Sequence, residues 1–251
     1  MRRLEFLGLE GLRQVRAGDS LGELICEACR QEEIHISDED VLVVAQKIVS
    51  KAEGRTLTLT GIKPSERALE LARRLDKDPA LVEVILSESR EIIRIGGKAL
   101  IVETHHGFIC ANAGVDQSNV GQNEVALLPR DPDGSARAIR SEIQRRTGKS
   151  PGVIISDSFG RPWRLGTVDV AVGVAGLKCV KDERGRLDGY GYQLKAAVAA
   201  IADEIAAAAE LVMGKTDGVP VVIARGCKIE KEEGSVRELF RPAAEDLFRR
   251  F

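Results

Sequence analysis

Hydrophobic and polar positions along the chain alternate in blocks that predict strands interleaved with helices. Three unbroken apolar runs rich in β-branched residues are typical of strands buried on both faces. They cover residues 40–45, 152–156 and 219–225. Two shorter runs, residues 99–103 and 108–111, flank Thr104-His-His-Gly107 and predict a hairpin.

Helical spacing of apolar positions, preceded by capping residues, predicts five helices between these strands. They cover residues 20–30 after Asp19-Ser20, 64–74 from Pro64, a segment opened by Asp78-Pro79, 135–146 capped by Ser135, and 194–213. The order of the elements predicts an α/β or α+β fold, with a mixed sheet and flanking helices.

Composition narrows the classes of partner. The chain has 251 residues, is 43% hydrophobic and carries a formal net charge of -2, with 37 Lys+Arg against 39 Asp+Glu. This length and composition allow one large core or two modest ones. Balanced charge gives no general attraction to nucleic acid or to anionic membranes, so we expect neither as a partner.

No segment predicts a membrane span or an export signal. The longest apolar stretch, residues 196–213, is interrupted by Asp203, Glu204 and Glu210. Five cysteines, an odd number, fit a reducing cytoplasm better than a disulfide framework. The single Cys26-x-x-Cys29 pair favours buried helix cysteines over zinc, which needs four ligands. We therefore expect a cytoplasmic protein.

Two acidic residues in separate segments are candidates for a metal site. Asp157 follows the strand at residues 152–156 and precedes Ser158, a place where α/β proteins bind ligands. Asp116 and Asn119 lie in the small, polar segment 112–119. Oxygen donors of this kind suit magnesium or manganese, whereas a helix cap or an ordinary Asx turn is the alternative for each.

Lysines follow another predicted strand. The polar segment 46–55 carries Lys47 and Lys51 directly after residues 40–45. Lysines near a strand end are good phosphate partners, although solvated surface lysines remain the alternative. The Gly214-Lys-Thr sequence is not a P-loop, because position 209 is Ala209 and the order is helix to strand. Its glycine-bounded loop can still cradle phosphate or simply end a helix.

An ordered set of motifs resembles the coenzyme F-420:gamma-glutamyl ligase family from about Leu4 to Arg241. The motifs are EGLRQVRAGD at residues 10–19, VSKAEGR at 49–55, NAGVDQSNV at 112–120, DPDGS at 131–135, ISDSFGR at 155–161, ADEIA at 202–206 and GVPVVIARG at 218–226. Each is weak alone, but together they are highly specific.

The resemblance implies a ligase that uses GTP to add L-glutamate to the deazaflavin precursor of coenzyme F-420. In the mechanism proposed for the family, GTP phosphorylates the acceptor carboxylate and the glutamate amine displaces phosphate. Two divalent ions, magnesium or manganese, would offset the repulsion between the carboxylate and the triphosphate. The resemblance leaves potassium open as an additional ion.

The same resemblance implies roles for particular residues and an intertwined homodimer of mixed α/β subunits. Asp116, Asp157 and Ser158 match metal ligands. The residues that match nucleotide contacts are Leu12, Arg13, Gln14, Val15, Gln46, Lys47, Lys51, Asn119, Met213, Gly214, Lys215, Thr216, Asp217 and Gly218. No residue is assigned as a catalytic base.

One departure affects the predicted second metal. Archaeal members of the family carry Glu where this chain has Lys215, so one acidic ligand is missing and the lysine could neutralise charge instead. We expect residues 1–251 to form one ligase unit, with two intertwined subdomains as a possible division and no flavin domain appended. A metal-dependent phosphohydrolase or nucleotide transferase, and a GTP-binding dimer without catalysis, are the alternative functions.

Overall fold

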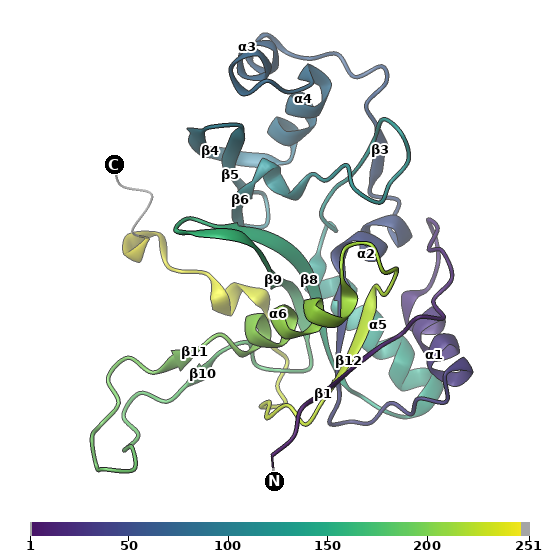
Figure 1. Cartoon of the computed structure of the whole chain (residues 1–251), viewed down its shortest axis with the longest axis vertical. Helices are drawn as coiled ribbons and strands as arrows, with labels where there is room; N and C mark the ends of the chain where they lie inside the picture. Colours follow the sequence, from purple (N-terminus) through teal and green to yellow (C-terminus); the bar gives the residue numbers. More distant parts are fainter. Residues whose placement is uncertain (1, 247–251) are drawn as a thin grey trace.

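The centre of the molecule is a five-stranded mixed sheet (Figure 1). Its strands, in spatial order, are β1 (Glu5–Gly8), β12 (Val221–Arg225), β2 (Val41–Ala45), β8 (Gly152–Arg161) and β9 (Arg164–Ala175). Strands β2 and β8 are parallel, and the other neighbours are antiparallel. This computed structural model describes residues 2–246, so residue 1 and residues 247–251 of the predicted unit lie outside the described residues. The predicted mixed α/β class is confirmed.

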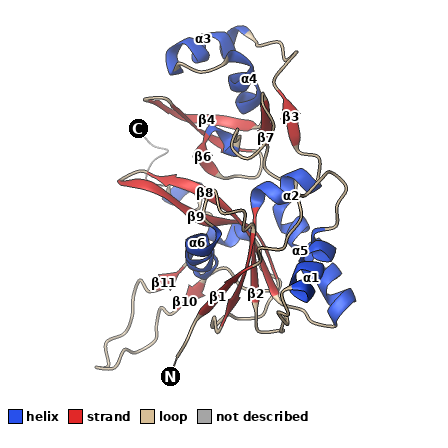
Figure 2. Ribbon diagram, turned by 45° about the vertical axis from the view of Figure 1, so that its right-hand side comes forward, coloured by secondary structure: helices blue, strands red, loops and turns tan. Residues whose placement is uncertain are grey.

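Helices cover both faces of this sheet. Helix α6 (Ile201–Met213) packs on one face, and α5 (Pro132–Thr147) packs on the other with α1 (Leu21–Gln31) beside it (Figure 2). Val43, Ile154 and Ile223 between these layers are fully buried. Burying a side chain of this size contributes about 1.5–3 kcal/mol, so the apolar runs that predict strands also form the core.

A second hydrophobic core lies beside the first, at the top of Figure 1. It is built from α3 (Glu66–Leu75), α4 (Pro79–Ser87) and the three-stranded sheet of β4 (Ser89–Gly96), β5 (Ala99–Thr104) and β6 (Ile109–Ala111). Strands β3 (Thr56–Thr58) and β7 (Glu124–Ala126) pair at its margin. The division of the chain into two subdomains stays a prediction.

The remaining elements are short. Helix α2 (Gln46–Ala52) follows β2 directly, and strands β10 (Lys181–Asp182) and β11 (Val198–Ala199) form the base of an arm that projects from the body (Figure 1). Three single turns complete the chain: η1 (Asn112–Gly114), η2 (Val236–Leu239) and η3 (Ala243–Glu245). Within residues 2–246, no helix has the length and apolar character needed to cross a membrane.

Several predicted elements are confirmed and several boundaries are wrong. Helices α1, α3 and α4 lie where predicted, with Ser20, Ser65 and Asp78 as their N-caps. The cap of α5 is Asp131 instead of Ser135, because Pro132 occupies the first helical position. Helix α6 begins at residue 201 instead of 194, because residues 198–199 pair with β10.

The largest correction concerns β8, which does not end at Ser156. It continues to Arg161 and pairs with β9, a strand that the sequence reading missed, as it missed β1 and β4. Asp157 and Ser158 therefore lie within a paired strand instead of a loop. Residues 46–52 form α2 where only a polar segment was predicted.

Four chain segments meet at one edge of the central sheet. Ala45 at the end of β2 pairs with Ser156 in the parallel β8. The antiparallel β12 begins at this edge, where the Ala45 amide donates to the Pro220 carbonyl at 2.8 Å. β1 ends here too, with the Leu9 amide bonded to Val221. The segments that follow β1 and β2 and precede β12 are thus brought beside residues 156–158.

Candidate active site

A pocket of about 310 Å³ lies at this edge of the sheet. Its lining includes every residue that was predicted for the site except Asp217. These are Leu12, Arg13, Gln14, Val15, Gln46, Lys47, Lys51, Asp116, Asn119, Asp157, Ser158, Met213, Gly214, Lys215, Thr216 and Gly218. The fold therefore brings these distant segments of the chain together at one pocket, which the sequence alone could not establish.

Helix α2 presents Lys47 and Lys51 to the pocket. Residues four apart lie on one face of a helix, and the buried Gln46 amide anchors the first turn by donating to Ser50 Oγ at 2.6 Å and to the Leu127 carbonyl at 3.0 Å. A lysine pair spaced i,i+4 around the apolar Ile48 and Val49 was the missed signal for this helix.

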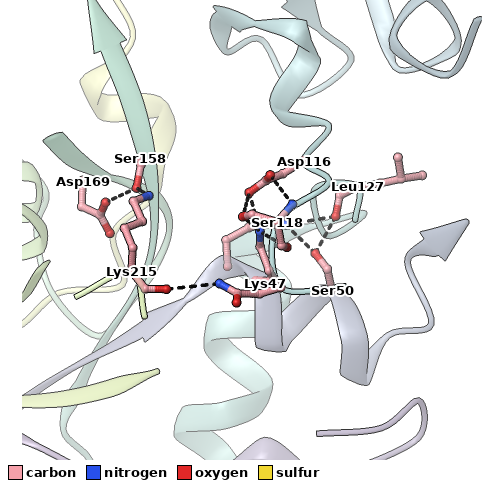
Figure 3. Close-up of polar contacts among 10 residues, drawn as sticks. Lys47, Ser50, Asp116, Ser118, Leu127, Ser158, Asp169 and Lys215 are labelled. Atoms are coloured by element: carbon pink, nitrogen blue, oxygen red, sulfur yellow. Dashed lines mark hydrogen bonds and ion pairs between the residues drawn. The ribbon is translucent and has the colours of Figure 1, made fainter. Parts of the chain in front are cut away.

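The two lysines differ in their partners. Lys47 Nζ forms an ion pair with Asp116 and donates to the carbonyl of Ser118 at 2.6 Å (Figure 3). The Lys51 ammonium group has no hydrogen-bond or ion-pair partner among residues 2–246. Burial, and then the charge of Lys47, lower its pKa. Its ammonium is therefore available to an anionic ligand.

Asp116 is held by its loop and by Lys47. Its backbone pairs with Ala126 through two hydrogen bonds, of 3.0 and 2.8 Å, which fix the segment to β7. Burial opposes ionisation of this carboxyl, but hydrogen bonds from Lys47 and Ser118 outweigh it and lower its pKa. Asp116 is thus a stable carboxylate at neutral pH.

The pKa of Asp157 is shifted in the opposite direction from that of Asp116. Its side chain is only partly accessible, and the surrounding protein desolvates it. Burial, together with the charges of Asp169 and Asp116, raises its pKa to about 7 against the backbone hydrogen bond from Ser158. The charge of Lys47 offsets this increase only in part, and a bound cation would add the positive charge that Asp157 needs.

The pocket lining also includes residues that were not predicted for the site, among them Ser118, Asp169 and Glu210. Asp169 is 4% exposed and accepts hydrogen bonds from Ser156 at 2.9 Å and Ser158 at 2.6 Å. A single carboxylate within the alternating Val168-Asp-Val170 run of β9 was its sequence signal. Glu210, in the last turns of α6, has a pKa raised by burial and by Asp169.

The loop after α6 closes the pocket on the side of β12. The Lys215 ammonium contacts the hydroxyl of Ser158, and the Lys215 carbonyl accepts from Asn119 Nδ2 at 3.3 Å. Asp217 folds back instead, since a Cβ atom placed on Gly214 would lie 2.4 Å from its carboxylate. This packing explains why Asp217 is the one predicted residue absent from the lining.

The donor set fits one hard cation better than two. Among the described residues, no three His, Cys, Asp or Glu side chains are grouped so as to hold a metal. Asp116 and Asp157 nevertheless supply two carboxylates from two segments, and magnesium is commonly held by one or two carboxylates plus substrate phosphates. Ser158 already contacts a cation, Lys215. Cys26 and Cys29 are buried in α1, as predicted for helix cysteines.

Comparison with known proteins identifies the family. Residues 11–226 match the family described as F420-0:Gamma-glutamyl ligase. The chain belongs to this family. The resemblance predicted from the motifs is therefore confirmed.

Curated relatives in the family match over their full length. The chain is 50% identical over 249 residues to "Coenzyme F420:L-glutamate ligase" of Methanothermobacter thermautotrophicus, covering 98% of this chain and 99% of the relative. It is 46% identical to the protein of the same name from Methanocaldococcus jannaschii, covering 99% and 98%. For Methanopyrus kandleri the identity is 47%, covering 98% and 97%.

Proposed function

We propose that this member of the F420-0:gamma-glutamyl ligase family joins L-glutamate to the deazaflavin precursor of coenzyme F420 and uses GTP to drive the reaction. The observation that supports the proposal most directly is the pocket at the carboxyl end of β2 and the middle of β8. Four acidic and four basic side chains line it: Asp116, Asp157, Asp169 and Glu210 with Arg13, Lys47, Lys51 and Lys215. Such a mixture suits small ligands of high charge.

The basic side chains account for nucleotide binding. Lys51 lacks an internal partner, so its ammonium can meet a phosphate without first breaking an ion pair. Arg13 also lines the pocket, and its guanidinium donates two hydrogen bonds to Asp19, of 2.8 and 2.9 Å. The glycine-bounded loop at residues 214–218 adds backbone donors. These features support the assignment of residues 12–15, 46, 47, 51, 119 and 213–218 as nucleotide contacts.

The acidic side chains account for the metal. Asp116 and Asp157 would hold a magnesium or manganese ion, which when bound offsets negative charge on the phosphates. Lys47, which pairs with Asp116, also lines the pocket and can share its charge with an incoming phosphate. Burial around Asp157 strengthens each of these electrostatic interactions by excluding water.

The reaction is a coupled pair of transfers. The acceptor carboxylate oxygen attacks the γ-phosphorus of GTP, the bond to the β–γ bridging oxygen breaks, and GDP leaves. The glutamate amine then attacks the acyl carbon, inorganic phosphate leaves with the bonding electron pair, and the amine loses a proton. Cationic side chains that line the pocket reduce the repulsion between the two anionic reactants.

We also propose a homodimer, with the arm at residues 183–197 as one of its contacts. Leu187, Tyr190 and Tyr192 are 67%, 100% and 58% exposed on this projection. Exposed aromatic residues on a segment with few internal contacts are typical of protein interfaces. A second copy of the chain is the partner that the resemblance implies.

An isotope experiment tests the acyl-phosphate route. Acceptor labelled with ¹⁸O in its reacting carboxylate is incubated with GTP, L-glutamate and magnesium. We expect one ¹⁸O atom in each inorganic phosphate released, because the carboxylate oxygen forms the bond to phosphorus. Phosphate that carries oxygen from water instead would favour a phosphohydrolase.

A further inference from the structure

One side of the pocket contains a cation that belongs to the protein. The Lys215 ammonium donates to the Ser158 hydroxyl, and that hydroxyl in turn donates to Asp169 (Figure 3). Because the lysine can only donate, the direction of the chain of hydrogen bonds is fixed. Lys47, Asp116 and Ser118 form a separate group on the opposite side (Figure 3).

The oxygen atoms around Lys215 would otherwise suit a metal ion. Asp169 is buried, and a buried carboxylate needs a positive charge or several hydrogen bonds. Glu210 lines the same pocket. The ammonium is thus bonded to a hydroxyl that is itself bonded to a buried carboxylate, in a pocket with a further carboxylate in its lining.

The backbone also holds Lys215 in place. Gly214 has a φ of +57°, a left-handed conformation that a side chain would strain. The carbonyl of Lys215 is bonded to Asn119 on the opposite loop. The backbone on both sides of the side chain is thus fixed, and the contact with Ser158 places the ammonium at the pocket.

The two sides of the pocket differ in spare acceptor capacity. Each oxygen of Asp169 already accepts a hydroxyl, and Ser158 already accepts the lysine. The carboxylate of Asp157, by contrast, accepts no hydrogen bond from any side chain among residues 2–246. Vacant acceptor sites on Asp157, next to Asp116, leave room for one added cation.

We propose that the Lys215 ammonium is a built-in cation that fills the place of a second divalent ion at Ser158, Asp169 and Glu210, so that the nucleotide-bound pocket takes a single divalent ion at Asp116 and Asp157. This inference rests on the proposed function, because it assumes a metal–nucleotide complex in the pocket. The lysine would neutralise phosphate charge as a tethered monovalent group.

Counting bound Mn²⁺ tests the inference. Electron paramagnetic resonance measures free Mn²⁺ in titrations of the protein with a saturating non-hydrolysable GTP analogue, corrected by titration of the analogue alone. We expect one protein-dependent ion for the native chain and for Lys215→Arg. Lys215→Ala should gain a second ion, and Lys215→Glu should bind that ion at least about 10-fold more tightly than Lys215→Ala.

Matched controls keep the result interpretable. Lys98→Ala, at an exposed position that pairs with Asp76 in the other core, should keep one ion. Thermal melting verifies that each variant is folded. Two ions or none in the native chain, or an unchanged count in both Lys215→Ala and Lys215→Glu, would overturn the inference. Failure of the proposed function would appear separately, as absence of glutamyl product in a turnover assay.

Discussion

At the scale of single residues, Asp157 and Lys51 are suited to ligands of opposite charge, a cation and an anion. Asp157 is a carboxyl group without enough positive charge around it, and Lys51 is an ammonium group that forms no ion pair among the described residues. The chemistry of both residue types could be predicted from the sequence. The burial of Asp157 could not, because it depends on β9, whose Asp169 adds negative charge beside it.

Replacing Asp157 with Asn should stabilise the metal-free protein. In the folded state the pKa is raised from 3.8 to about 7, so the folded protein holds a proton that the unfolded chain releases. Stability of the native chain therefore falls as pH rises from about 4 to 7. We expect Asp157→Asn to be more stable by about 1–3 kcal/mol above pH 7, with little difference below pH 4.

Denaturant unfolding of both proteins in chelator, from pH 4 to 8.5, measures this difference. The variant should also lose metal-dependent turnover, since its amide carries no charge. Equal stabilities across the pH range would show that Asp157 is well solvated and that our electrostatic description of it is wrong.

Lys51→Ala should weaken GTP binding by about 10-fold or more, which corresponds to about 1.4 kcal/mol. The loss follows from removing a cation that has no competing internal partner. Isothermal titration with GTP and magnesium measures the affinity, and Lys98→Ala serves as the exposed control. An unchanged affinity for Lys51→Ala would assign Lys51 to the solvated surface.

At the scale of elements, the turn that precedes Asp116 is the most constrained part of the site. Asn112, Ala113 and Gly114 have consecutive positive φ angles of 54°, 56° and 69°. Sequence reading predicted an irregular loop here but not its left-handed form, because the turn is imposed by packing on both sides. A Cβ atom at Gly114 would lie 2.9 Å from Leu128.

Gly114→Ala should therefore destabilise the protein by about 2–3 kcal/mol and impair metal binding. The left-handed backbone costs about 1 kcal/mol, and overpacking against Leu128 adds about 1–2 kcal/mol. Gly148→Ala is the matched control, with a φ of +72° and no atom near the added methyl group. It should cost only the first amount and leave metal affinity unchanged; equal losses for both variants would contradict the packing argument.

Much of the element order could be predicted from pattern, and the exceptions share a cause. Strand β2 is apolar throughout and β12 is apolar up to its last residue, Arg225, so the pattern predicts both strands directly. Strand β9 and the outer half of β8 carry polar residues, and four residues of these two strands line the pocket: Ser156, Asp157, Ser158 and Asp169. Helix α2 was missed because its pocket side is charged. Polar residues that line the pocket thus interrupt the hydrophobic pattern from which these strands and this helix could have been predicted.

At the scale of the whole molecule, topology assembles the pocket from distant segments. Parallel pairing of β2 with β8 and antiparallel insertion of β12 align the ends of strands that lie more than a hundred residues apart. Motif order alone identified the family but not this adjacency. The proposed homodimer is argued at the same scale, from the projecting arm.

Replacing Leu187 and Tyr190 together with Ser should shift the protein from dimer to monomer. Both side chains are more than half exposed, so the fold of one chain does not depend on them. Light scattering after size-exclusion chromatography measures the mass, and Leu57→Ser, 42% exposed on β3, is the control. A native chain that is monomeric, or a double variant that remains dimeric, would exclude this arm as the dimer contact.

The central claim is that the pocket couples GTP cleavage to amide formation. Mass spectrometry of the acceptor, combined with measurement of GDP in the same reaction, tests it most directly. With acceptor, L-glutamate, GTP and magnesium, we predict one GDP for each glutamyl residue added, and no GDP when the acceptor or glutamate is omitted. GDP release without a gain of acceptor mass, or acceptor gain without GDP, would contradict the account.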